Sequence, residues 1–145
     1  MPTRTGPEYP SNWNGWPEAM SSEDYAIWQR WKAKGMLGVR KLHFNVGLGP
    51  GTPAVGANTP KEAEGWRFLT QKRADVIAVH EAHIEIIELR FQAGANALGR
   101  LRMYMMLYMT DPVLGEHVTL RLVTDHIDAD ARKMAEMDGI EVDVV

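Results

Sequence analysis

The stretch "RADVIAVHEAHIEIIELRF" (residues 73–91) decides the fold. It contains two apolar runs of strand length, about 73–80 and 84–91, which are separated by the short segment "HEAH". Two runs rich in Val and Ile that are joined by a few polar residues are typical of a β-hairpin. Each run also carries an acid, Asp75 in the first and Glu88 in the second, although the rest of each run is made of core residues.

These two acids are predicted to lie in one site. Alternate side chains of a strand share a face, so Glu88 and Arg90 project to the same side of the second run. A tight turn at 80–83 places Asp75 opposite about 88 to 90, and Asp75, Glu88 and Arg90 then meet. The alternative is a partly buried ion pair that survives as a relic or sets the strand register.

The rest of the chain supplies helices and strands around this hairpin. Apolar periodicity and capping residues predict further elements: a helix at 21–35 capped by Ser21 or Ser22, a strand at 39–48, a Gly/Pro-rich loop at 49–66, a helix at 96–109, a strand at 117–124, a helix capped by Asp128 or Asp130 that ends at Gly139, and a strand at 140–145. The order α-β-β-β-α-β-α-β predicts an α/β fold with a mixed sheet, because short links favour antiparallel strands and crossover helices require parallel ones.

Residues 1–20 are predicted to form an extended arm in front of a single domain at 21–145. Pro2, Pro7, Pro10 and Pro17 disfavour regular structure in this segment. Trp13 and Trp16 are costly to leave in water, so the arm is expected either to lie over its own domain or to dock on a partner. We therefore take the two tryptophans as candidate partner-docking residues.

Composition limits the classes of function. The 145 residues fit one domain, the formal net charge of −3 provides no global basic field for nucleic acid, and the absence of cysteine excludes disulfides and thiolate chemistry. No apolar run has the length of a membrane span or signal peptide, which predicts a protein without a membrane partner that is cytoplasmic at synthesis, with a virion as a further destination. His80 and His83 in the hairpin turn are interpreted as solvated rather than as zinc ligands.

The arrangement of Asp75, Glu88 and Arg90 resembles the PD-(D/E)XK nuclease superfamily, which has the restriction-endonuclease-like fold. The resemblance covers roughly residues 21–124 and consists of an αβββαβ core, to which a C-terminal αβ unit is added. An aspartate on the second core strand precedes "Glu88-Leu89-Arg90" on the third by 13 positions. The resemblance implies that Asp75 and Glu88 hold Mg²⁺ in an active member, and that a lysine in the third place activates the attacking water.

Two departures from the family pattern concern the catalytic residues. Arg90 occupies the lysine place, and a guanidinium stays protonated in proteins and cannot serve as a base. On the helix "ALGRLRMYMMLY", Arg100 stands where family members often carry glutamine, and Tyr104 follows one turn later. Glu23 is the candidate for the extra acid of the first helix. Arg100, Arg102 and Tyr104 are candidate contacts for nucleic acid or a partner protein.

Two functions follow from the resemblance and the departures. The first is an assembly protein on a catalytically degenerate nuclease fold, as a bacteriophage virion component of the head–tail connector region. It would need no cofactor and would bind protein partners, including further copies of itself. The alternative is an active Mg²⁺-dependent DNA endonuclease or exonuclease. The ordered aromatic arm and the methionine-rich helix at 96–109 favour the assembly protein, because a helix that is apolar on most sides is either enclosed or meets a partner.

Overall fold

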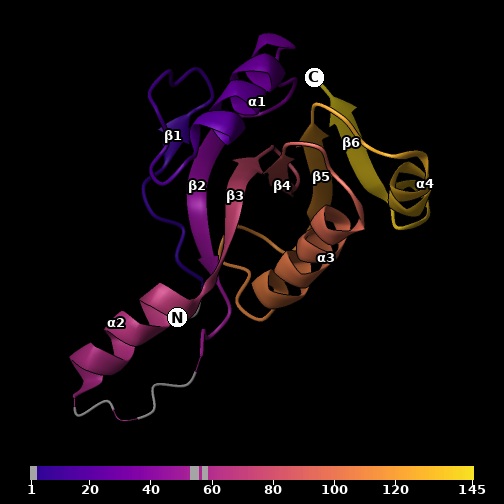
Figure 1. Cartoon of the computed structure of the whole chain (residues 1–145). Helices are drawn as coiled ribbons and strands as arrows, with labels where there is room; N and C mark the ends of the chain where they lie inside the picture. The colour runs from indigo at the N-terminus through magenta and orange to yellow at the C-terminus, as the bar shows by residue number, and fades with distance from the viewer. Residues whose placement is uncertain (1–2, 53–55, 57–58) are drawn as a thin grey trace.

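The computed structural model describes residues 3–52, 56 and 59–145, and within them the chain forms one six-stranded sheet with helices on both faces. The elements follow in the order β1 (Tyr9–Pro10), α1 (Ser22–Ala33), β2 (Lys41–Leu48), α2 (Pro60–Thr70), β3 (Lys72–Val79), β4 (Ile84–Arg90), α3 (Ala95–Met109), β5 (Val118–Thr124), α4 (Ala129–Met137) and β6 (Ile140–Val144). Figure 1 shows the helices around the central sheet.

The sheet is mixed, as predicted. Its strands lie in chain order from β1 to β6. The pairs among β1, β2, β3 and β4 are antiparallel, whereas β4–β5 and β5–β6 are parallel. The change of direction has a simple cause: β3 and β4 are joined by a short turn, while α3 and α4 provide the crossovers that parallel neighbours require. The predicted α/β fold with a mixed sheet and a C-terminal αβ extension is therefore confirmed.

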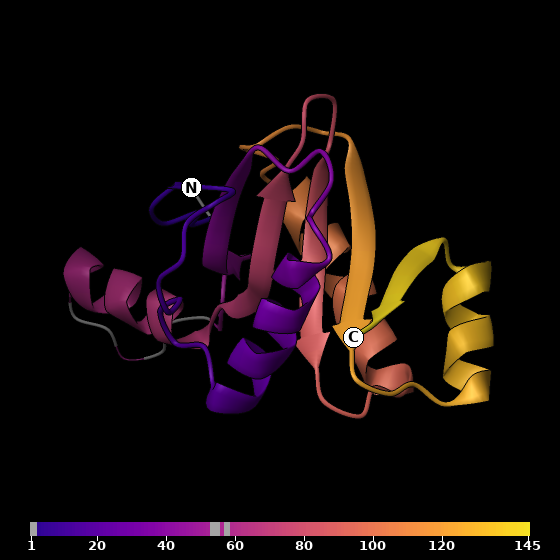
Figure 2. The same ribbon diagram turned by 90° about the horizontal axis from the view of Figure 1, so that it is seen from above.

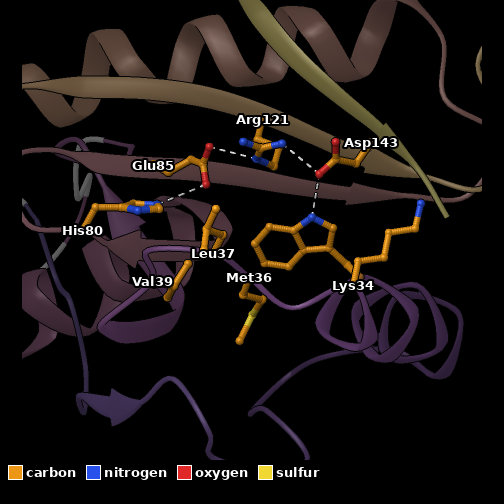
Figure 3. Close-up of a pocket in the computed structure, with 9 residues that line it drawn as sticks. Lys34, Met36, Leu37, Val39, His80, Glu85, Arg121 and Asp143 are labelled. Carbon is orange, nitrogen blue, oxygen red and sulfur yellow. Dashed lines mark hydrogen bonds and ion pairs between the residues drawn. The ribbon is translucent and has the colours of Figure 1, made fainter.

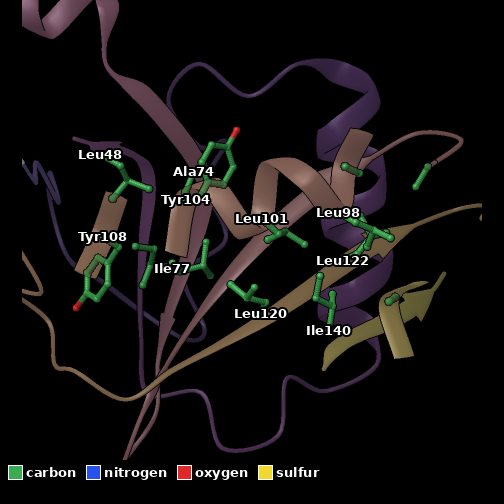
Figure 4. Packing of buried hydrophobic residues seen from close by; sticks show 14 of the residues in the cluster. Leu48, Ala74, Ile77, Leu98, Leu101, Tyr104, Tyr108, Leu120, Leu122 and Ile140 are labelled. Carbon is green, nitrogen blue, oxygen red and sulfur yellow. The ribbon is translucent and has the colours of Figure 1, made fainter. Parts of the chain in front are cut away.

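Two apolar layers hold the helices against the sheet. On one face, Ile27, Trp28 and Trp31 of α1 pack on strands β2 to β5. On the other face, α3 and α4 cover the sheet, and Figure 4 shows Leu98, Leu101 and other α3 side chains over the strands. Figure 2 shows the same arrangement from above, with α1 separated from α3 by the sheet. This second layer contains more buried apolar residues than the first, among them Leu98 and Leu101, and is therefore the larger part of the core.

Capping residues fix where the helices begin. The Ser21 side chain accepts a hydrogen bond from the backbone N–H of Asp24 at 3.1 Å, which sets the start of α1. Asp128 accepts from the N–H of Ala131 at 2.8 Å and does the same for α4. Each cap satisfies a backbone donor that has no partner inside its helix.

The arm at residues 1–20 lies along its own domain in the described part. Its two-residue strand β1 pairs with the edge of β2, a short strand that the proline-rich sequence did not predict. Trp13 packs between Tyr9 and Phe44, with ring centroids 4.2 and 5.5 Å away. Trp16 stacks on Tyr25 at 3.7 Å but is 55% exposed. The arm is thus held by its own domain, and the role of either tryptophan in docking a partner stays a prediction.

The loop prediction for 49–66 is wrong in its second half, where α2 begins at Pro60. Thr59 accepts a hydrogen bond from the N–H of Glu62 at 3.1 Å, and Pro60 stands in the first turn, where it has no helical hydrogen bond to lose. The high Gly and Pro content of the preceding residues concealed this start signal. Residues 53–55 and 57–58 of the predicted loop lie outside the described residues. No helix in the described part is long and apolar enough to cross a membrane.

Candidate carboxylate site at the end of the hairpin

Asp75 and Glu88 meet where the pairing of β3 with β4 ends. The register of the hairpin runs from Val79↔Ile84 to Val76↔Ile87, and the next two residues are Asp75 and Glu88. At this point the Asp75 side chain takes the place of a backbone acceptor, because its Oδ2 atom accepts the N–H of Leu89 at 2.9 Å. A side-chain hydrogen bond also joins Asp75 and Glu88.

The neighbouring strand β2 is distorted at the same level. Its pairs with β3 include Phe44↔Val76 and Val46↔Ala74, and Asn45 between them has φ 53°. A positive φ at a residue other than glycine is uncommon in a strand and bends the chain locally. The two strands that flank Asp75 therefore both depart from regular pairing beside the carboxylate.

Glu88 is buried, and no cation of the described residues is in hydrogen-bond contact with it. Only 3% of the residue is exposed, and its Oε2 atom has no hydrogen-bond partner among the described residues. Burial, the charge of Asp75 and the hydrogen bond to Asp75 together raise the pKa of Glu88 to about 9. Burial also raises the pKa of Asp75, against the lowering effects of its hydrogen bonds to Glu88 and Leu89. At neutral pH the pair therefore retains a proton that the two carboxyl groups share.

Two arginines and a tyrosine surround the pair. The charges of Arg100 and Arg90 both lower the pKa values of Asp75 and Glu88. Tyr104 is hydrogen-bonded to Arg100, and burial followed by the charges of Glu88 and Asp75 raises its pKa to about 12. The structure thus brings five of the predicted site residues together: Asp75, Glu88, Arg90, Arg100 and Tyr104.

Arg102 is placed elsewhere. Its side chain is 63% exposed and lies 3.7 Å from Asp138, at the end of α4. A helix turns by about 100° per residue, so a residue two positions after Arg100 points away from the sheet that Arg100 faces. A role for Arg102 in contacting nucleic acid or a partner would belong to that outer surface.

Asp24, and not Glu23, is the acid of α1 that faces the site. Burial and then the charge of Asp75 raise the pKa of Asp24 to about 6, against the lowering effect of the Arg90 charge. Glu23 is exposed. The helical spacing of the sequence could have identified Asp24. It lies three residues before Ile27 and four before Trp28, so it is on the same side of α1 as these buried residues.

The carboxylates of Asp75 and Glu88 could provide two ligands to a hard divalent cation. Among the described residues, no group of three or more His, Cys, Asp or Glu side chains is arranged to hold a metal ion. Mg²⁺, however, commonly binds through one or two carboxylates and keeps several waters. The unpartnered Oε2 of Glu88 beside Asp75 is the feature that suits such an ion.

Access to Asp75 is narrow. A cavity of about 20 Å³ beside it is lined by Glu18, Ala19, Met20 and Asn45. This volume holds about one water molecule. The turn at the end of the arm therefore covers the carboxylate in the structure.

A second polar cluster lies on the opposite face of the sheet and was not predicted from sequence. Arg121 of β5 donates to Glu85 of β4 and to Asp143 of β6, both at 2.8 Å, and the Trp31 indole also donates to Asp143 at 2.7 Å. Figure 3 shows these residues around a pocket of about 200 Å³. His80 lies 3.4 Å from Glu85 with 14% of its side chain exposed, so its interpretation as a solvated histidine is wrong.

This cluster is built as a structural link. Glu85 is as buried as Glu88, but both of its oxygens have partners, Arg121 and His80. The indole of Trp31 connects helix α1 to the strand β6 through Asp143. A row of alternating acid, base and acid across three parallel strands fixes their register, because a displaced strand would leave a buried charge unpaired.

Comparison with known proteins identifies the fold. No protein-family model matches the sequence, and no curated protein matches it. A repair endonuclease from Pyrococcus abyssi superposes with a TM-score of 0.51 and 17% identity, covering 91% of this chain and 49% of that one. EndoMS in complex with double-stranded DNA superposes with a TM-score of 0.50 and 16% identity, covering 91% of this chain and 48% of that one. A protein of unknown function superposes with a TM-score of 0.52 and 14% identity, covering 82% of this chain and 54% of that one.

These matches concern the fold alone. The chain spans about half the length of each of these solved structures. The nuclease-like α/β architecture that the sequence resemblance predicts is present, with repair endonucleases among its structural neighbours.

Proposed function

We propose that this protein is a non-catalytic assembly protein that uses a nuclease-like fold, and that its setting is a bacteriophage virion in the head–tail connector region. Arg90 carries the non-catalytic part of this proposal. It lies at the carboxylate pair, in the place where the family pattern has lysine, and its guanidinium cannot take up a proton. The large exposed side chains of α3, Met105, Met106 and Met109, support the assembly part.

The proposed loss of catalysis has a chemical reason, because the carboxylate pair and its two arginines provide no group that is free to take a proton from the attacking water. Hydrolysis of a phosphodiester requires a group that removes a proton from the attacking water. Asp75 and Glu88 already share a proton near neutral pH, and Arg90 and Arg100 are fixed cations. Mg²⁺, when bound, would lower the pKa of water and neutralise phosphate charge. Asp75 and Glu88 would hold the ion, and the arginines would anchor phosphate without accepting a proton.

The test combines the wild-type protein with plasmid or linear DNA and Mg²⁺ or Mn²⁺, beside an Asp75→Ala control. We expect no cleavage from either protein. Cleavage by the wild-type protein that disappears in Asp75→Ala would contradict the non-catalytic assignment. Arg90→Lys restores the family lysine, and a gain of cleavage in this variant would show that the arginine alone silences the site. Detection of the chain in purified phage particles by mass spectrometry tests the virion setting.

The second candidate is an active Mg²⁺-dependent DNA endonuclease or exonuclease. The observation in its favour is the buried pair Asp75–Glu88 with an unpartnered Oε2 atom, because a buried acceptor without a partner is costly unless a ligand uses it. In this case Asp75 and Glu88 are metal ligands and Arg90 is an electrostatic clamp on the phosphate. The cleavage assay above distinguishes the two candidates directly.

A further inference from the structure

Helix α2 stands apart from the core. None of its residues is buried, and Trp66 and Phe68 are each 46% exposed, while Leu69 is 75% exposed. Figures 1 and 2 both show α2 extending away from the sheet, near the ends of β2 and β3 that it connects. A helix this short is marginal on its own in water and gains stability mainly from packing. An exposed tryptophan and leucine at helical spacing of three therefore indicate a surface that meets a ligand or partner.

The charge around α2 is opposite to that of the whole chain. Arg4 and residues 59–73 contain five basic side chains and two acidic ones, whereas the full sequence has a net charge of −3. Arg4 and Arg73 lie over the ring of Phe68, with guanidinium carbons 5.4 and 4.3 Å from its centroid. The surface of α2 thus combines aromatic rings with cations.

This surface is connected to the carboxylate pair by direct contacts. The Arg73 guanidinium donates to the backbone oxygen of Phe68 at 2.6 Å and to that of Asn45 at 3.3 Å. Asn45 and Asp75 line the same small cavity. A chain that lies along α2 would therefore continue past Arg73 towards Asp75 and Glu88.

We propose that α2 binds single-stranded nucleic acid, with Trp66 stacking on an unpaired base and Lys61, Arg67 and Lys72 meeting the phosphates. This inference rests on the proposed nuclease-like site for the identity of the ligand, but it does not require cleavage. Proteins hold single strands by aromatic platforms beside a cationic track, since every base has a π-face. A paired base inside a duplex is not available to a tryptophan on a protruding helix, and this favours single strands over duplex.

The test measures the fluorescence anisotropy of a labelled oligothymidine, titrated with the full-length protein in EDTA so that no strand is cut. Trp66→Ala is expected to weaken binding roughly 5- to 150-fold. Trp66→Phe should restore much of the affinity, because it keeps an aromatic face. Trp16→Ala is the matched control: Trp16 is similarly exposed, at 55%, but stacks on Tyr25 of α1, so this variant should bind like the wild type.

Charge is tested separately by the salt dependence of binding. The double variant Lys61→Gln with Lys72→Gln should reduce the slope of log Kd against log salt by about 1.4, because each contact with a single strand contributes about 0.7. Circular dichroism of each variant confirms that the fold is retained, since no residue of α2 is buried. The same oligonucleotide annealed into a duplex should bind more weakly.

Three outcomes overturn the proposal: wild-type affinity in Trp66→Ala, equal affinity for duplex, or a Trp66→Ala variant that changes only the oligomeric state in sedimentation. The last outcome would assign α2 to a contact between copies of this chain. Failure of the proposed function is recognised independently. Cleavage by the wild type in Mg²⁺ would contradict non-catalysis while leaving the binding result in EDTA intact.

Discussion

Replacing Glu88 with glutamine is expected to stabilise the protein, and to do so increasingly as the pH rises. Glutamine has nearly the same shape and can still donate a hydrogen bond to Asp75, but it carries no proton that is lost in the unfolded chain. The folded pKa of Glu88 is raised to about 9 from an ordinary value of 4.5, chiefly by burial. The wild-type residue therefore disfavours folding wherever the unfolded chain ionises and the folded protein does not.

The magnitude follows from linkage between proton binding and folding. Between pH 4.5 and about 9 the folded protein holds one proton more than the unfolded chain at this residue, so stability falls by up to about 1.4 kcal/mol per pH unit. The stabilising contribution is complete below pH 4.5 and is lost as the pH rises through the folded pKa. The difference in free energy of unfolding between Glu88→Gln and the wild type should therefore grow in favour of the variant by about 3–5 kcal/mol from pH 4.5 to pH 8. The range allows for the sharing of the proton with Asp75.

The assay is urea unfolding followed by circular dichroism at several pH values between 5 and 8.5. Glu85→Gln is the matched control, because Glu85 lies on the same strand and is equally buried, at 3% exposure. Its carboxylate is paired with Arg121 at 2.8 Å, and its replacement leaves that guanidinium with one partner fewer. Glu85→Gln should therefore destabilise the protein, in the opposite direction to Glu88→Gln.

Two results would refute the reasoning. The first is a Glu88→Gln protein whose stability falls with pH between 6 and 8 as steeply as that of the wild type. The second is a destabilisation by Glu88→Gln equal to that of Glu85→Gln, which would mean that the Glu88 carboxylate is compensated by the protein and not by a proton.

Further predictions concern the metal, the polar cluster and the arm. The nuclease alternative predicts that Mg²⁺ raises the wild-type Tm more at pH 8.5 than at pH 6, because the ion competes with the shared proton; equal shifts at both values would contradict it. Arg121→Met should cost about 3–5 kcal/mol in urea unfolding by removing the cation that pairs with Glu85 and Asp143, and a loss below about 1 kcal/mol would show that water replaces the guanidinium. Trp13→Ala should destabilise more than Trp16→Ala, because Trp13 packs on Phe44; equal effects in thermal unfolding would contradict this packing argument.

The hairpin and the positions of its acids could be predicted because the information is local. Alternating apolar residues and a short polar turn fix the register of β3 and β4, and the register alone places Asp75 beside Glu88. Helix α3 was equally accessible, since its apolar spacing continues for fifteen residues. The position of Tyr104 at the pair then follows from the buried side of α3, and Arg100 precedes it by one turn.

Features that depend on distant partners could not be predicted. Arg121 meets Glu85 and Asp143 from positions 36 and 22 residues away, across parallel strands whose relative register no turn specifies. Helix α2 was missed for a different reason. Its cap signal, Thr59 with Pro60, is preceded by a Gly/Pro-rich segment and is followed by a helix with no buried stripe, so the apolar periodicity that identifies most helices is absent.

The contrast between Glu85 and Glu88 indicates which face of the sheet has a function beyond stability. Both glutamates lie on β4 and both are buried, so each carries the same desolvation penalty. The sequence compensates Glu85 fully, with an arginine and a histidine, as expected for a charge retained for structure. Glu88 instead has a second carboxylate as its hydrogen-bonded neighbour and one oxygen without a partner among the described residues. An arrangement that costs stability and is not repaired by the fold is a candidate ligand site: the carboxylate pair suits a hydrated cation, and the two nearby arginines suit a phosphate.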